Sequence, residues 1–170
     1  MEKFIEKRTD YELNYGTLTL FETNCPCKDI KFFFEESVLT LMLSGHKTIT
    51  TEKMTIEFFP GTFFIPEKKC VQSLVIPNAS FDNPTKCLVL NINNSFMSEF
   101  YNDLILNNSI KDAALHLDEK EPIDYYMSNN SALIKNMIRL YETVKSEKNK
   151  ISNAICDLYI KELLLSLIHI

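Results

Sequence analysis

The sequence is poor in the residues that most chemical sites need. It has no tryptophan, three glycines and three histidines among 170 residues. Three glycines are too few for a glycine-rich phosphate loop, which excludes nucleotide binding by the usual loops. His46, His116 and His169 fall in a strand turn, a polar connection and the end of the last predicted helix. They are not expected to meet, so we expect no metal, no cofactor and no enzymatic centre.

Long apolar runs and an excess of positive charge are also missing. No window reaches the roughly 18 to 20 apolar residues that cross a bilayer, and residues 1–10 are charged rather than signal-like. We therefore expect a cytoplasmic protein without a membrane partner. The 18 basic residues face 23 acidic ones, a net charge of −5. Phosphate binding needs clustered Lys and Arg, so this chain is not expected to bind DNA by itself.

Cysteines give no framework either. The five are an odd number without regular spacing, which favours reduced, mostly buried thiols over disulfides. Cys25 and Cys27 have a one-residue gap, whereas structural zinc sites space such a pair two to four apart and supply a second pair. The sequence therefore predicts no structural zinc site.

What the sequence has in its first half is a succession of short strands. Its 170 residues, 45% of them hydrophobic, suffice for one globular domain. Turn signals every eight to twelve residues are typical of a small barrel or sandwich, and about seven or eight strands are expected. The ranges that we expect as strands are 16–23, 38–43, 47–51, 54–59, 62–65, 71–76 and 87–92.

After residue 94 the apolar period becomes helical. Phe96, Phe100 and Leu104 recur at a spacing of four and predict a short helix. A polar connection over 107–124 follows, with one turn of structure expected at 113–117. Apolar positions then mark an amphipathic helix, at Ile134, Met137, Ile138, Tyr141 and Val144. Its other positions are assigned to a solvated face, and they are Lys135, Asn136, Arg139, Glu142 and Lys145.

The last segment, 151–170, is predicted to be a helix with two apolar stripes. The wide stripe suits packing on the domain and comprises Cys156, Tyr159, Ile160, Leu163, Leu164 and Leu167. The narrow stripe comprises Ile151, Ala154, Ile155, Leu158 and Leu165, flanked by Lys161 and Glu162. An exposed narrow stripe is the usual geometry of a helix pair between subunits. The alternative is that both stripes are buried within one monomer.

The interior of the barrel is open to two interpretations. An eight-stranded barrel is either filled by side chains or just wide enough for one small ligand. The 12 Phe and 7 Tyr residues favour core packing, and a Phe-lined pocket for an apolar or amphipathic effector is the alternative. The candidates for contact with such a ligand are Thr40, Met42 and Phe64.

Four blocks of sequence carry a resemblance to a known family. They are FEESVLTLMLSGHK (34–47), FPGTFFIP (59–66), NPTKCLVLNI (83–92) and IKELLL (160–165). In these blocks and their order the chain resembles the amino-terminal regulatory domain of AraC-type transcriptional regulators. It departs from many such domains and related cupins at 69–71, where Lys, Cys and Val stand near the usual position of a histidine.

The resemblance implies an α+β fold, a cupin-like β-barrel or jelly roll followed by C-terminal helices in an antiparallel hairpin. It divides the chain into a barrel with an N-terminal arm, 1–93, and a helical dimerisation segment of the same domain, 94–170. It implies non-catalytic sensing of a small-molecule or protein effector by a homodimer. DNA would be bound only through a helix-turn-helix module, which we expect beyond Ile170 because the chain stops within a leucine-rich helix.

The resemblance also places the family's dimer face on the narrow stripe of the last helix. The predicted dimer interface is Ala154, Ile155, Leu158, Lys161 and Leu165. Two other interpretations remain open. A small cupin-like enzyme or carbohydrate-binding protein would share the barrel and need a metal or a convergent polar pocket, and a structural interaction domain would have a filled barrel.

Overall fold

The computed structural model of the chain describes residues 6–32, 34–51, 55–66, 72–76, 78–106, 125–146 and 150–168. The strands in these ranges are β1 (Glu6–Leu13), β2 (Gly16–Thr23), β3 (Cys27–Phe32), β4 (Ser37–Ser44), β5 (Lys47–Thr50), β6 (Thr55–Phe58), β7 (Phe63–Pro66), β8 (Gln72–Ile76), β9 (Thr85–Ile92) and β10 (Tyr125–Ser128). The helices are α1 (Asn94–Leu106), α2 (Ser131–Ser146) and α3 (Lys150–Ile168). None of these helices is long and apolar enough to cross a bilayer.

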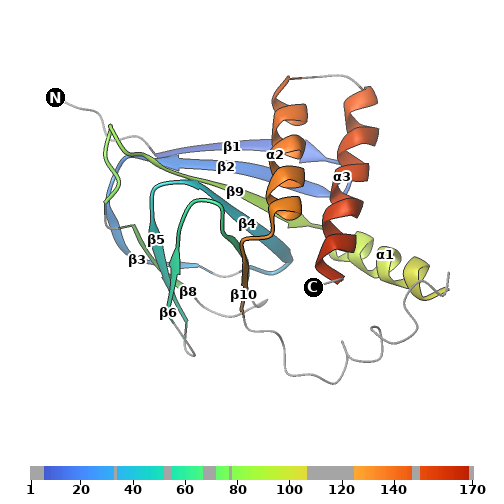
Figure 1. Cartoon of the computed structure of the whole chain (residues 1–170), viewed down its shortest axis with the longest axis horizontal. Helices are drawn as coiled ribbons and strands as arrows, with labels where there is room; N and C mark the ends of the chain where they lie inside the picture. The colour runs from blue at the N-terminus through green and yellow to red at the C-terminus, as the bar shows by residue number, and fades with distance from the viewer. Residues whose placement is uncertain are drawn as a thin grey trace.

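The strands form two antiparallel sheets that face each other (Figure 1). The larger sheet has the order β1-β2-β9-β4-β7-β10, and the smaller has the order β3-β8-β5-β6. Strands β2 to β9 thus divide into two sets of four, and the chain crosses between the sheets after each strand except at the β5–β6 hairpin, which lies within the smaller sheet. This is the topology of a jelly roll, the double-sheet fold that cupins share. β1 and β10 extend the larger sheet at its two edges. The predicted α+β, cupin-like jelly roll with C-terminal helices is confirmed.

The larger sheet is apolar on both faces, and its register keeps the two faces distinct. Side chains alternate along each strand, so residues in one cross-strand row share a face. One row pairs Leu18 with Leu90 and Leu90 with Leu39 across β2, β9 and β4. The next row pairs Thr19 with Val89 and Val89 with Thr40, on the opposite face. Leucines therefore line one face. The other, which we call the threonine face, carries Thr19, Thr40 and Val89 together with Phe21 and Phe64.

The leucine face packs against the helices. Its leucines form one hydrophobic cluster with buried residues of α1, α2 and α3. α2 and α3 lie side by side as an antiparallel hairpin on this side of the sheet (Figure 1). The wide stripe of α3 contributes Cys156, Ile160, Leu163 and Leu164, all buried as predicted.

One residue of α2 was assigned to the wrong face. Asn136, predicted to be solvated, is only 3% exposed. It lies three residues after Leu133 and four before Leu140, which are both buried. Residues at these spacings share one side of a helix, so Asn136 belongs to the side that faces the core. In the sequence, the apolar residues next to Asn136 already account for the buried side of the helix, so the pattern does not predict a buried asparagine.

Three strands were missing from the sequence prediction. The expected strands correspond to β2 and to β4 through β9, but β1, β3 and β10 bring the described total to ten. The sequence predicts a charged N-terminal arm, yet β1 pairs with β2 over its whole length, from Glu6 opposite Thr23 to Leu13 opposite Gly16. β10 lies beyond the predicted division at residue 94 and pairs with β7. The turn expected at 113–117 lies outside the described residues.

Two glycines with the same backbone conformation provide a test of the packing between β4 and β9. Gly45 and Gly61 have φ values of 78° and 80°, where a side chain costs about 1–2 kcal/mol. A Cβ at Gly45 would also lie 2.8 Å from Thr85 Cα, whereas one at Gly61 would meet only Ile134 Cδ1, at 3.9 Å. We expect Gly45→Ala to lower the free energy of unfolding by about 2 kcal/mol more than Gly61→Ala. Urea unfolding of both variants measures this difference, and equal losses would contradict the close approach at Thr85.

Candidate functional site

A cavity of about 450 Å³ lies inside the jelly roll, between the two sheets. This volume is within the range of small-molecule sites, about 300–1,000 Å³. The larger sheet contributes the threonine face described above, and the smaller sheet contributes side chains of β3, β5 and β8. The apolar part of the lining includes Phe21, Ile49, Phe64, Leu74, Ile76 and Val89. Of the two interpretations of the barrel, the structure therefore favours the hollow one.

One end of the cavity is polar. Lys47, on β5, is 6% exposed. Its Nζ donates a weak hydrogen bond to Cys87 Sγ at 3.6 Å and lies 4.8 Å from the ring centroid of Phe58. Thr85 is 1% exposed and lines the same cavity two residues before Cys87 on β9. Within the described part of the chain, Thr85 Oγ1 has no hydrogen-bond partner.

Local sequence explains how these two groups come together. Gly45 allows the tight turn between β4 and β5, and the turn packs directly against Thr85 at the start of β9. Along β5, Lys47 and Ile49 point into the cavity, while Thr48 points outward and donates a hydrogen bond to Glu57. The sequence signal for this site was a lysine that shares one face of a strand with Ile49, and the sequence prediction missed it.

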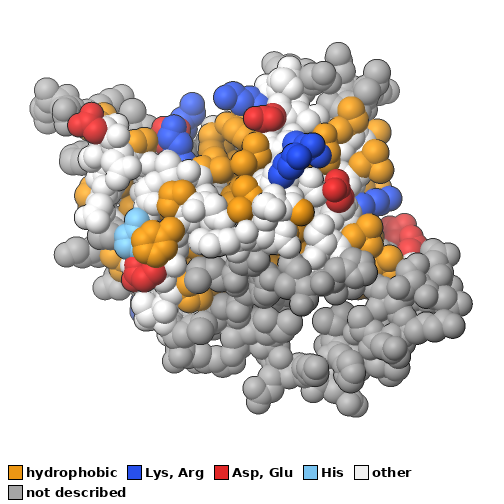
Figure 2. Space-filling view, viewed as in Figure 1, with side chains coloured by type: hydrophobic (Ala, Val, Ile, Leu, Met, Phe, Trp, Pro, Cys, Tyr) orange, Lys and Arg blue, Asp and Glu red, His pale blue; other side chains and the backbone are white. Residues whose placement is uncertain are grey.

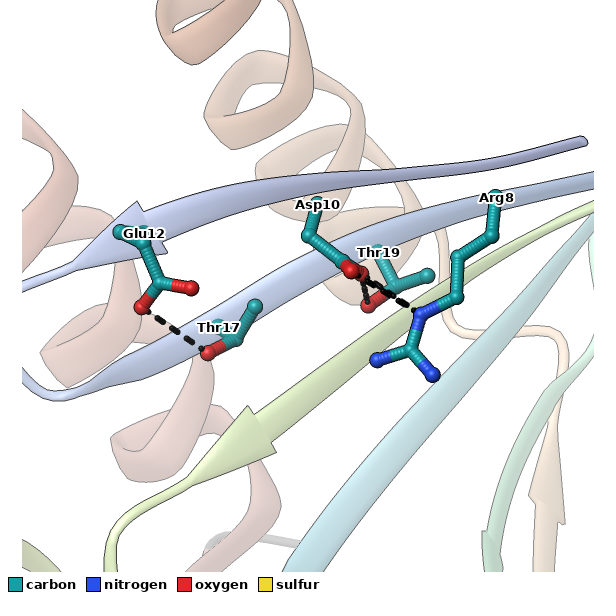
Figure 3. A network of polar contacts seen from close by, with 5 residues as sticks. All are labelled: Arg8, Asp10, Glu12, Thr17 and Thr19. Atoms are coloured by element: carbon teal, nitrogen blue, oxygen red, sulfur yellow. Dashed lines mark hydrogen bonds and ion pairs between the residues drawn. The ribbon is translucent and has the colours of Figure 1, made fainter.

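The cavity is bordered on another side by the edge strand β1, through Glu6 and Arg8. Arg8 Nε lies 2.9 Å from Asp10 Oδ1 and 3.0 Å from Oδ2. Thr19 Oγ1, from β2, donates a hydrogen bond of 2.6 Å to the same carboxylate (Figure 3). These contacts, first the Thr19 hydroxyl and then Arg8, lower the pKa of Asp10 below its ordinary value of 3.8. These contacts hold the Arg8 side chain on the side of β1 that borders the cavity.

Two of the three predicted ligand residues line the cavity, and the third does not. Thr40 and Phe64 pair across β4 and β7, and both line the cavity. Met42 is on the same face of β4 but packs in a buried cluster with Ile49 and Phe58 and is not part of the lining. Their contact with a ligand stays a prediction.

The narrow stripe of α3 is exposed in the single chain from Ala154 onward, and the side chain of Ile151 lies outside the described residues. Leu158 is 65% exposed, Leu165 38% and Ile155 37%, and Ala154 and Lys161 are also exposed. These three are half of the six exposed large hydrophobic side chains among the described residues, and Figure 2 shows hydrophobic side chains gathered over α3. The interpretation in which both stripes are buried within one monomer is therefore wrong. We call Ala154, Ile155, Leu158, Lys161 and Leu165 the α3 seam.

Other candidate groups do not converge. Within the described ranges, no three His, Cys, Asp or Glu side chains lie close enough together to hold a metal ion. His46 contacts Glu57 and stacks on the ring of Phe59, with 4.7 Å between the centroids. Cys25, Cys87 and Cys156 are free thiols. His116, His169 and Cys70 lie outside the described residues, as does the side chain of Cys27.

Comparison with known proteins gives a consistent result. The family model described as the AraC-type transcriptional regulator N-terminus matches residues 15–169. Among solved structures, ToxT from Vibrio cholerae has a TM-score of 0.63 and 13% identity, covering 90% of this chain and 56% of its own. The AraC-like transcriptional activator CuxR has a TM-score of 0.64 and 11% identity, covering 98% of this chain and 56% of its own. At these identities the likeness shows the fold, and the chain spans just over half the length of each regulator. No match was found among curated proteins.

The network on β1 predicts a pH dependence of stability. The pKa of Asp10 is lower in the folded protein, so its contribution is present above about pH 4 and is lost as pH falls through the folded-state pKa. Asp10→Asn should lower the free energy of unfolding at pH 7 by at most about 1 kcal/mol, since the pair is exposed. This difference should disappear in denaturant titrations at acidic pH.

The matched control for Asp10→Asn is a substitution of Glu12, two residues further along β1. Glu12 Oε2 accepts a hydrogen bond from Thr17 Oγ1 at 3.4 Å, a longer contact than the 2.6 Å between Thr19 and Asp10. Glu12→Gln should therefore change stability less than Asp10→Asn. A difference between Asp10→Asn and the unmodified protein that stays constant from pH 7 to pH 2 would contradict the role given to the Asp10 carboxylate.

Proposed function

This chain belongs to the AraC-type transcriptional regulators as an N-terminal regulatory domain, and we propose that it senses a small-molecule effector in the jelly-roll cavity and forms a homodimer through the α3 seam. The observation that carries the proposal is the two-sided larger sheet. One face borders a hollow, mostly apolar interior, and the other supports a helix whose outer side is apolar and exposed.

The sensing part of the proposal rests on the lining of the cavity. Phe21, Phe64, Leu74 and Val89 expose apolar surface to the interior. Removing such surface from water is worth about 25 cal/mol per Å², so an apolar ligand that fits would stabilise the folded domain. A filled barrel, as a structural interaction domain would have, offers no such gain. The cavity therefore favours a sensor over a structural interaction domain.

The dimer part rests on the shape of the α3 seam. An exposed apolar strip on a helix is stabilised when it packs against a second helix, and a two-fold axis pairs the same strip with itself. Lys161 and Glu162 flank the strip and are both exposed. In a two-fold pair, Lys161 can face Glu162 of the partner subunit, which complements the apolar contact.

β1 offers a physical link between the cavity and the seam. Its first half borders the cavity through Arg8, and the turn that follows it holds Asn14, whose Nδ2 donates a 2.9 Å hydrogen bond to Asp157 Oδ2. Asp157 directly precedes Leu158 of the seam. We infer that an effector acts by favouring one arrangement of β1 against α3, because a ligand shifts an equilibrium only by its differential affinity for the two states.

The proposal also covers how the whole regulator contacts DNA, where it acts and whether this domain has a catalytic role. We propose that DNA is contacted through a module other than this chain and that the protein acts in the cytoplasm. The domain itself is proposed to be non-catalytic, a role that rests on the family. Stoichiometric zinc, iron or manganese in the purified protein would instead favour a small cupin-like enzyme.

A single substitution in the seam tests the dimer. Leu158→Asp should give a folded monomer at micromolar concentration, because a carboxylate buried in an apolar interface is costly and the jelly roll is untouched. Asn102→Asp adds the same charge on an exposed position of α1 and should stay dimeric. Light scattering gives the mass and circular dichroism the fold. A Leu158→Asp dimer would contradict the seam assignment.

A pair of phenylalanine substitutions tests the cavity. Val89 lines it, whereas Val75 of β8 is half-buried and lies outside the lining. Val89→Phe should fill the interior and lower the fluorescence of bound anilinonaphthalene sulfonate severalfold, and Val75→Phe should not. Native mass spectrometry of the same preparations should show less co-purified small molecule on Val89→Phe. Equal dye binding by both variants would contradict binding in the cavity.

A further inference from the structure

We propose that the cavity takes an amphipathic monocarboxylate, whose carboxylate is bound by Lys47 and Thr85 and whose apolar body lies against the rest of the lining. This inference rests on the proposed sensing function and adds the chemical class of the effector. It is carried by two buried polar groups, Lys47 and Thr85, at one end of a mostly apolar interior.

The first of these groups is a buried positive charge. Lys47 is 6% exposed, and none of the described Asp or Glu side chains pairs with it. Its contacts are the sulfur of Cys87, which is a weak acceptor, and the face of the Phe58 ring. Neither carries a full negative charge, and a buried charge is costly unless it is paired. A negatively charged ligand group would supply the pairing.

The second group is the hydroxyl of Thr85. Its Oγ1 is buried, borders the same cavity and has no hydrogen-bond partner in the ranges that the structure describes. Thr85 and Cys87 share one face of β9, and Lys47 Nζ reaches Cys87, so the ammonium and the hydroxyl lie at the same end of the cavity. A hydroxyl is able to donate one hydrogen bond, and an ammonium up to three.

These donors favour a carboxylate over other polar groups. A carboxylate has one negative charge and two oxygens, which matches one ammonium and one hydroxyl. A phosphate monoester carries nearly two charges at neutral pH, and a single lysine would leave much of that charge uncompensated. A sugar has more hydroxyls than the few polar side chains of the lining can pair, and the rest would lie against side chains such as Ile49, Leu74 and Ile76, which offer no hydrogen bonds.

The remaining charged groups of the lining do not compete for this role. Among the described lining residues they are Glu6 and Arg8, both exposed on β1. Arg8 is already paired with Asp10, at 2.9 Å. Exposed, paired charges contribute little to the binding of a buried group. The buried end with Lys47 is thus the part of the cavity that distinguishes an anion from a neutral ligand.

The test compares ligands that differ only in the head group. Octanoate is compared with 1-octanol, and 3-phenylpropionate with 3-phenylpropanol, by calorimetry and thermal shift on the intact domain. We expect each carboxylate to bind about ten to a hundred times more tightly than its alcohol. Lys47→Met should abolish this preference without loss of alcohol binding, and Thr85→Val should reduce it.

The control for charge is Lys86→Met. Lys86 is also on β9, but its Nζ pairs with Glu22 Oε1 at 3.0 Å, and it lies outside the cavity lining. It should keep the full preference for carboxylates. The unliganded Lys47→Met protein should melt at the same or a higher temperature, because an unpaired buried charge has been removed.

Other outcomes separate this inference from the proposed function. Equal affinity of octanoate and 1-octanol, or a preference that survives Lys47→Met, would overturn the carboxylate class and leave sensing in the cavity intact. Binding by none of the four compounds would also overturn it, and sensing would then be decided by the dye and mass spectrometry experiments on Val89→Phe. The comparison of carboxylates with alcohols uses the unmodified protein. It therefore tests the carboxylate class even if one of the variants fails to fold.

Discussion

The register that aligns β2, β9 and β4 is the constraint on which the rest of the structure depends. It places Leu18, Leu90 and Leu39 in one row and Thr19, Val89 and Thr40 in the next, on opposite faces. A slip of one residue in any of these strands would move leucines into the cavity and threonines against the helices. The helix-packed core and the hollow interior are therefore two consequences of one alignment.

This arrangement also brings the two functional surfaces close to a common element. β1 adds to the edge of the larger sheet and alternates in the same way. Tyr11 points to the helices, where its ring meets that of Tyr141 at 6.0 Å between centroids, and Arg8 points to the cavity. A strand held at a sheet edge has fewer neighbours than a central strand, so β1 costs less to shift than β2, β9 or β4. That suits the coupling proposed for it.

Much of the architecture could be predicted because it follows from local patterns. Alternation of Thr and Leu along 16–23 identified β2, and the stripes of 151–170 separated the buried side of α3 from its exposed seam. β1 was missed because its charged residues give no alternating apolar pattern. Pairing with β2 nevertheless provides hydrogen-bond partners for its backbone. Asn136 was misplaced because a polar side chain suggests a solvated position, although its spacing from Leu133 and Leu140 puts it on the buried side of α2.

By itself, the sequence determined the strand-rich first half, the helical second half and the two-sided last helix, since periodicities of 2 and 3.6 are properties of neighbouring residues. Only the tertiary structure decided that the barrel is hollow and that Lys47 and Thr85 meet at one end of it. These two residues are far apart in the chain, and they come together because the β4–β5 turn at Gly45, two residues before Lys47, packs against Thr85. Whether a cavity is filled depends on the volumes of side chains from several strands at once, which no local pattern records.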